Sequence, residues 1–198
     1  MSPQKRPVLT NIYQNIMNKN NQTTMPNGIY LVHEDGHYEP FNEENSKENV
    51  KYVGIVHDGH AFCVALKDLG EFPLVKNIRK CPGESDLYVR RECDALNDWE
   101  YVERTKHIQE VGTDIPLNDG EYLPSLPMLV AMCYWAERGL NAALEYVGGE
   151  PLRMDDYCWS ATEYISYNAW YVYFGSGYVH NNFKYSGIVA RAVAAFNL

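Results

Sequence analysis

The sequence lacks the short motifs through which several common enzyme classes bind a substrate or a cofactor. It contains no G-x-S-x-G nucleophile turn, no Gly-rich phosphate loop and no G-x-G-x-x-G dinucleotide fingerprint. Its acidic doublets, such as Asp155-Asp156, do not stand in the frame of a calcium-binding loop. His57 and His60 flank an Asp-Gly turn without a third metal ligand nearby, which favours a turn role. We therefore expect a protein that is not an enzyme, with no catalytic residue, no cofactor and no metal site.

A net positive charge and a long apolar run are also missing. The 198 residues hold 17 Lys and Arg against 26 Asp and Glu, which gives a formal net charge of −9. Phosphate backbones and anionic lipid surfaces repel such a chain, so we expect no nucleic-acid partner. No run approaches the roughly 18 apolar residues of a membrane span, and no apolar segment of a secretion signal follows the first residues. We expect the chain to be synthesised in the cytoplasm and not to insert into a membrane.

Cysteine is sparse and follows no metal-binding pattern. The chain has five cysteines without a C-x-x-C pair, at positions 63, 81, 93, 133 and 158. An odd number at such wide spacing predicts neither a zinc site nor a dense disulfide framework. Buried, reduced thiols are the usual state of such residues. A bridge between Cys81 and Cys93 stays open as an alternative, and only after export.

Hydrophobic periodicity predicts an α+β fold in one domain over residues 28–198, behind a flexible polar arm at 1–27. In the β-rich part at 28–80, we expect a strand at 29–32 and a hairpin that pairs 52–56 with 61–66. Apolar residues at helical spacing predict three further elements, which are helices over 97–111, from Ser125 to Gly139, and over 141–147.

The C-terminal third changes to the period of a strand. Alternation predicts that Trp170, Val172 and Phe174 face the core, while Tyr171 and Tyr173 face outward. A turn at 175–177 then leads to a returning strand at 178–184. The last segment, 189–196, is rich in small apolar residues and indicates a central strand that is covered on both faces.

Tyrosine is unusually frequent in this third of the chain. The sequence has 16 Tyr, and seven of them lie between residues 157 and 185. Tyr together with Ser, Gly and Asn is typical of adaptable binding loops, because a Tyr ring offers large contact area and loses little entropy when it is bound. The composition therefore favours an exposed ligand-binding face. A Tyr-rich sheet that packs on another subunit is the alternative.

Several segments, taken in order, resemble a C-type lectin-like family that Bacteroides and their phages carry. The matching segments are Tyr122-Leu-Pro-Ser-Leu126, Asn141-Ala-Ala-Leu144 with Gly148-Gly149, Tyr157-Cys-Trp-Ser-Ala-Thr-Glu163, Asn168-Ala-Trp-Tyr-Val172 and Arg191-Ala-Val-Ala-Ala-Phe196. The resemblance covers about residues 28–198 and implies a C-type lectin-like fold, with two helices packed on antiparallel sheets and an N-terminal β-hairpin extension. The calcium and sugar motifs of animal lectins are absent, so no calcium site is carried over.

Within that family the segment 157–196 resembles the variable region of a diversity-generating retroelement target. Mutation of adenines in Asn-type codons cannot produce Trp, Met, Lys, Glu or Gln, and the residues of these types in the segment fall at positions that we assign to the scaffold. The resemblance implies a variable ligand-binding face made by Ile165, Tyr167, Tyr171, Tyr173, Ser176, Tyr178, His180, Asn181, Asn182, Phe183, Tyr185, Ser186 and Ile188.

The resemblance implies a receptor-binding protein, either at the tip of a phage tail fibre or as a surface adhesin. Its partner would be a bacterial cell-surface protein or glycan, and it would act in the virion, or on the cell surface after export. Related tip proteins imply a homotrimer, whose several sites would add avidity. Two alternatives stay open, namely an enzyme similar to the formylglycine-generating proteins and a structural virion or pilus subunit.

Overall fold

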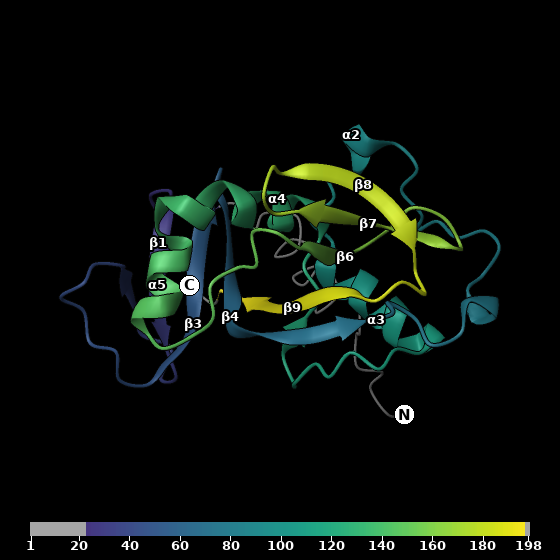
Figure 1. The fold of residues 1–198 in the computed structure, drawn as a ribbon. Helices are drawn as coiled ribbons and strands as arrows, with labels where there is room; N and C mark the ends of the chain where they lie inside the picture. The colour runs from purple at the N-terminus through teal and green to yellow at the C-terminus, as the bar shows by residue number, and fades with distance from the viewer. Residues whose placement is uncertain (1–22, 197–198) are drawn as a thin grey trace, which may run out of the picture.

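The computed structural model describes residues 23–196 of the chain (Figure 1). Its elements in chain order are β1 (Gly28–His33), β2 (Tyr38–Pro40), β3 (Val50–His57), β4 (His60–Phe72), η1 (Ile78–Lys80), α2 (Glu92–Ala95), α3 (Tyr101–Val111), β5 (Glu121–Tyr122), α4 (Leu126–Trp135), the π-helical turn η2 (Ala136–Leu140), α5 (Asn141–Tyr146), β6 (Tyr157–Glu163), β7 (Asn168–Tyr173), β8 (Tyr178–Phe183) and β9 (Ile188–Ala195).

One nine-stranded sheet organises the molecule, which confirms the predicted α+β class. The strands follow the order β2-β1-β3-β4-β9-β6-β7-β8, and β5 pairs with β9 beside this path. The sheet is continuous, whereas the resemblance implied separate sheets. The prediction of a central last strand is confirmed, because β9 lies between β4 and β6 and seven of its eight residues are buried.

Strand β4 joins the two halves of the sheet. Its first part pairs with β3, and the whole strand runs alongside β9, with register shifts between Val64 and Asp68 and between Asp68 and Gly70. Figure 1 shows the strand turning a corner in this region, so that β1 and β3 run across the direction of β6, β7 and β8. Irregular residues of this kind bend a strand and increase its twist. The β6–β8 strands thereby form a separate wing with two faces of their own.

One face of this wing packs on α4. Trp170, Val172 and Phe174 are 5, 0 and 3 % exposed and join the largest apolar cluster, together with Leu129 of α4 and Leu144 of α5. The predicted inward orientation of Trp170, Val172 and Phe174 is therefore confirmed. The indole N–H of Trp170 also donates to the carbonyl oxygen of Val89 at 2.8 Å, which satisfies its only polar atom.

The opposite face is covered along only part of its length. Trp159 of β6 is fully buried there against Leu74 and Ile108, and its indole N–H donates to the carbonyl oxygen of Phe72 at 2.9 Å. The loop after β4 and helix α3 supply this cover. This cover ends near Trp159, and the side chains at the far ends of β6, β7 and β8 lie outside it.

Two features of the helices differ from the prediction. Helix α3 begins at Tyr101 instead of residue 97, because the Asp98 carboxylate forms a buried ion pair with Arg104 and accepts a hydrogen bond from the Thr162 hydroxyl at 3.1 Å. The short helix α2 was not predicted. The predicted end of the helix from Ser125 at Gly139 is confirmed, because Arg138 and Gly139 have non-helical backbone angles, with Gly139 at φ 125°, and this kink separates α4 from α5.

Residues just before β1 contact the β3–β4 turn. The Thr23 N–H donates to the Gly59 carbonyl oxygen at 2.6 Å, and the Asn27 side chain contacts Asp58. The folded domain therefore starts before Gly28. Residues 1–22 of the predicted flexible arm lie outside the described residues.

The described residues also bear on the thiols and on membrane insertion. All five cysteines are free, and Cys63 and Cys158 are buried as expected, whereas Cys93 is exposed. Burial raises the pKa of both the Cys63 and the Cys158 thiol to about 12, which keeps them protonated. Between residues 23 and 196, no helix combines the length and the apolar character that a bilayer crossing requires.

Candidate functional site

Aromatic side chains gather at the uncovered end of the β6–β8 wing. In the antiparallel register, Tyr157 of β6 lies opposite Tyr173 of β7, Tyr173 lies opposite Tyr178 of β8, and Tyr171 lies opposite His180. Directly paired residues point to the same face of a sheet. These five side chains, Tyr157, Tyr171, Tyr173, Tyr178 and His180, therefore share one surface, which we call the aromatic face.

The rings of the aromatic face contact one another. The Tyr157 ring lies 5.0 Å from the Tyr171 ring and 5.0 Å from the Tyr173 ring, measured between centroids. The Tyr178 and His180 rings stack at 5.7 Å. Tyr178 is 54 % and Tyr157 is 43 % exposed, whereas Tyr171 and Tyr173 are half-buried between them. Mutual packing fixes the half-buried rings, so the face is a preformed apolar surface with exposed hydroxyl groups.

Few charged residues lie in the segment that carries most of these rings. Between residues 164 and 188 the only charged side chain is Lys184, in a chain with a formal net charge of −9. Lys184 is fully buried and pairs with the buried carboxylate of Glu163. The exposed Arg153 and Asp155 come shortly before Tyr157, so the charged side chains next to this Tyr-rich area lie on the Tyr157 side.

The thirteen predicted face residues fall into three groups. The exposed ones are Tyr167, Ser176, Tyr178, His180, Phe183 and Tyr185. The half-buried ones are Ile165, Tyr171, Tyr173, Asn181, Asn182 and Ser186. Ile188 is 7 % exposed and packs in the apolar cluster with Leu74 and Trp159, so its placement on the face is wrong.

The predicted residues also do not share a single surface. Along β8, Tyr178 and His180 point to the aromatic face, and strand alternation sends Asn181 and Phe183 to the opposite one. The Asn181 side chain accepts a hydrogen bond from Asn168, and the Phe183 ring stacks on Tyr185 at 5.1 Å. The expectation of one continuous face is therefore corrected to an aromatic face plus a separate exposed pair, Phe183 and Tyr185.

Within residues 157–196, the four residues that were assigned to the scaffold because of their type are all buried. Trp159, Glu163, Trp170 and Lys184 are 0, 1, 5 and 0 % exposed. The prediction that these four positions belong to the scaffold is confirmed. Because the scaffold residues are buried and the face residues are exposed, substitutions on the face can leave the core unchanged.

A buried ionic group lies beneath the wing. One oxygen of Glu163 contacts the Lys184 ammonium, and the other lies 2.6 Å from Nδ1 of His107 in α3. Burial acts to raise the pKa of Glu163, but the hydrogen bond from His107 and the charge of Lys184 outweigh it and lower that pKa. The same hydrogen bond raises the pKa of His107 against the opposing effect of burial. The group therefore favours an ionised Glu163 and a protonated His107.

The pKa shift of His107 predicts a pH-dependent contribution to stability. A raised folded-state pKa contributes stability that is complete below the ordinary histidine value of 6.5 and is lost as pH rises through the folded value. The lowered pKa of Glu163 sets the acid limit. We expect His107→Gln to reduce the free energy of unfolding most at pH values between the lowered pKa of Glu163 and 6.5. The reduction should become progressively smaller as pH rises through the raised pKa of His107.

Urea unfolding of both proteins across pH 5 to 9, roughly the range in which histidines titrate, measures this difference. A constant difference for His107→Gln at every pH would contradict the prediction.

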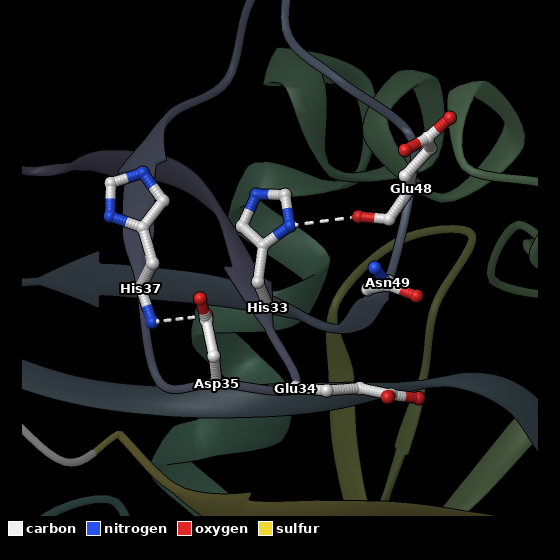
Figure 2. Close-up of a pocket in the computed structure, with 6 residues that line it drawn as sticks. All are labelled: His33, Glu34, Asp35, His37, Glu48 and Asn49. Atoms are coloured by element: carbon white, nitrogen blue, oxygen red, sulfur yellow. Dashed lines mark hydrogen bonds between the residues drawn. The ribbon is translucent and has the colours of Figure 1, made fainter.

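A hollow of about 310 Å³ lies at the other end of the sheet, beside the β1–β2 turn (Figure 2). Its lining residues are His33, Glu34, Asp35, His37, Glu48 and Asn49. Figure 2 shows the imidazoles of His33 and His37 side by side, with ring centroids 5.5 Å apart. This hollow was not predicted, although residues 33–37 carry the H-E-x-x-H spacing that could have identified it.

The chain is similar in fold to a solved fimbrial protein from Bacteroides ovatus. The TM-score is 0.55 at 15 % identity, and the match covers 85 % of this chain and 48 % of the fimbrial protein. The chain thus spans about half the length of that protein. No protein-family model and no curated protein matches the sequence. The likeness concerns the fold alone.

Proposed function

We propose that the protein acts by binding and that its aromatic face recognises a protein or glycan on a bacterial surface. The observation that supports this most is the cluster of mutually packed rings of Tyr157, Tyr171, Tyr173, Tyr178 and His180 on one face of the wing. Tyr is enriched at the centre of binding interfaces, where large rings with one polar group supply most of the affinity. A preformed face also loses little entropy on binding.

The finer part of the proposal comes from the resemblance. The wing is the variable region of a C-type lectin-like protein that a retroelement diversifies, at a phage tail-fibre tip or on a cell-surface adhesin. The buried positions of Trp159, Glu163, Trp170 and Lys184 support this part, because these residue types cannot arise in the diversified codons. A homotrimer would give the avidity that single weak sites lack.

A structural subunit of a fimbria or virion is the second candidate function. The fold of the fimbrial protein from Bacteroides ovatus favours it. In such a subunit the aromatic face would pack permanently on a neighbouring subunit, and the purified protein would bind no separate ligand. An aromatic surface serves both roles, so binding to an external ligand is the property that separates them.

Binding arrays test the proposal and separate the two candidates. We expect the purified protein to bind a defined set of bacterial glycans or surface proteins on printed arrays, and the variant with Tyr173→Ala and Tyr178→Ala to lose at least about 90 % of that signal. EDTA should leave the signal unchanged, because the aromatic face contains no cation-binding group.

The matched control is Tyr134→Ala. Tyr134 of α4 is 46 % exposed and lies outside the wing, so its loss should preserve binding. An array on which the wild-type protein binds no ligand, combined with concentration-dependent assembly of the chain, would favour the structural subunit. Equal loss of signal in Tyr134→Ala and in the double variant would contradict the proposal that the aromatic face binds the ligand.

A further inference from the structure

Three potential metal ligands lie together on the β1–β2 hairpin. The His33 N–H donates to the His37 carbonyl oxygen at 2.8 Å across the turn, and Glu39 follows two residues later in β2. Residues opposite each other in a hairpin, and residues two apart in one strand, point to the same face. The structure shows this proximity, because Oε1 of Glu39 lies 3.4 Å from Nε2 of His33.

His33 is prepared as a ligand in a way that an ordinary turn histidine is not. Its side chain is only 10 % exposed, and its Nε2 atom is buried without a hydrogen-bond partner. Its Nδ1 atom lies 3.0 Å from the carbonyl oxygen of Glu48, as Figure 2 shows. A carbonyl can only accept, so Nδ1 donates to it, and Nε2 is the ring atom that faces the Glu39 carboxylate. Metal-binding histidines in proteins are commonly oriented by such a backbone carbonyl.

The separations fit a tetrahedral divalent ion. Ligand bonds of about 2.0 to 2.1 Å at tetrahedral angles place two ligand atoms about 3.4 Å apart. The 3.4 Å between Nε2 of His33 and Oε1 of Glu39 equals this separation. Two imidazoles and one carboxylate also form a donor set that suits zinc and similar borderline ions. The neighbouring acidic side chains Glu34, Asp35 and Glu48 add a negative potential that attracts a cation.

We propose that His33, His37 and Glu39 bind one divalent ion of the zinc class at the β1–β2 hairpin, where His33 and His37 line the hollow of Figure 2 and Glu39 contacts His33. Within residues 23–196 no three His, Cys, Asp or Glu side chains already surround one point, so the ion assembles the site. His37 is exposed in the turn and rotates to supply its imidazole, while water fills the fourth position. The bound ion links β1 to β2 across their turn. This proposed site differs from the expectation from the sequence, which was that the protein has no metal site.

The geometry gives the site a structural role and no protease chemistry. In zinc proteases the H-E-x-x-H residues lie on a helix, and the Glu carboxylate activates the bound water. Here residues 33–37 form a hairpin turn, and Figure 2 shows the Glu34 carboxylate pointing away from both imidazoles. The site is also independent of the proposed ligand face, because β1–β2 and β8 lie at opposite ends of the strand order.

Calorimetric titration of the full chain, without a polyhistidine tag and after EDTA treatment and dialysis, tests the proposal with ZnCl2 as the probe. We expect one Zn²⁺ per chain and a rise in melting temperature on binding. His37→Gln and Glu39→Gln should each weaken binding more than about 100-fold, because loss of an outer partner alone already costs about 10- to 100-fold. His37 is exposed, so its replacement leaves the fold intact.

Two matched controls locate the ion. His180→Gln removes another histidine whose Nδ1 contacts a backbone carbonyl oxygen, and Cys93→Ser removes the exposed thiol, so both should bind Zn²⁺ as the wild-type protein does. X-ray absorption should show only nitrogen and oxygen neighbours at about 2.0 to 2.1 Å. Zinc binding that survives His37→Gln, sulfur neighbours in the spectrum, or no heat at all would each overturn the proposal.

Discussion

Lys184→Met is expected to lower the free energy of unfolding by about 3 to 5 kcal/mol, although methionine matches the apolar stem of lysine in length. The ammonium of Lys184 and the carboxylate of Glu163 are 0 and 1 % exposed, so neither reaches water. Without Lys184, the Glu163 carboxylate stays buried with His107 as its remaining ionic partner. A buried ionic group that loses one partner costs far more than the net gain from the intact pair, and the contact with His107 offsets only part of the Glu163 charge.

The double variant with Lys184→Met and Glu163→Leu separates this cause from a simple packing defect. It removes both charges, so we expect it to recover most of the lost stability. Chemical unfolding of the wild-type protein, the single variant and the double variant measures the coupling between the two residues. A double variant that is less stable than Lys184→Met would show that packing, and not the charge, causes the loss.

Trp170→Ala is expected to lower the free energy of unfolding by about 3 to 5 kcal/mol through the cavity that it leaves. Trp170 is 5 % exposed, packs between the wing and α4, and donates its indole N–H to Val89. Tyr178→Ala should cost under about 1 kcal/mol, because Tyr178 is 54 % exposed on the edge strand. Ligand binding should respond in the opposite order.

Thermal unfolding of the two variants checks this contrast. A loss of 1 kcal/mol shifts the melting temperature of a domain of this size by about 2 to 4 °C, so Trp170→Ala should melt at least about 4 °C below Tyr178→Ala. Equal melting temperatures would contradict the division of the wing into a buried scaffold and an exposed face.

Alternation and capping signals predicted the frame of the molecule well. Period-2 alternation placed Trp170, Val172 and Phe174 in the core, because a strand that is half-buried leaves one face for each parity. Small apolar residues over 189–196 correctly indicated a central strand. Such local signals succeed where a residue's neighbours in sequence decide its environment.

The sequence could not give features that depend on distant partners. Helix α3 starts late because Asp98 pairs with Arg104 and Thr162, and a carboxylate in an N-cap position gives no hint of that competition. Ile188 was placed on the face, but it lies just after a turn, where alternation does not fix its direction, and the loop residue Leu74 covers it. The hairpin hollow was missed because its residues come together through a turn and the 48–49 segment.

The central claim is that the aromatic face binds the ligand, and one affinity measurement tests it most directly. The ligand identified on the arrays is titrated by surface plasmon resonance against the wild-type protein and against a variant with Tyr157, Tyr171, Tyr173 and Tyr178 of the aromatic face all changed to Ala. Circular dichroism of the same samples establishes that the variant is folded. We expect its dissociation constant to rise by at least about 100-fold, since aromatic anchors carry most of the energy of such an interface. A folded quadruple variant that binds with the wild-type dissociation constant would contradict the account and place recognition elsewhere on the chain.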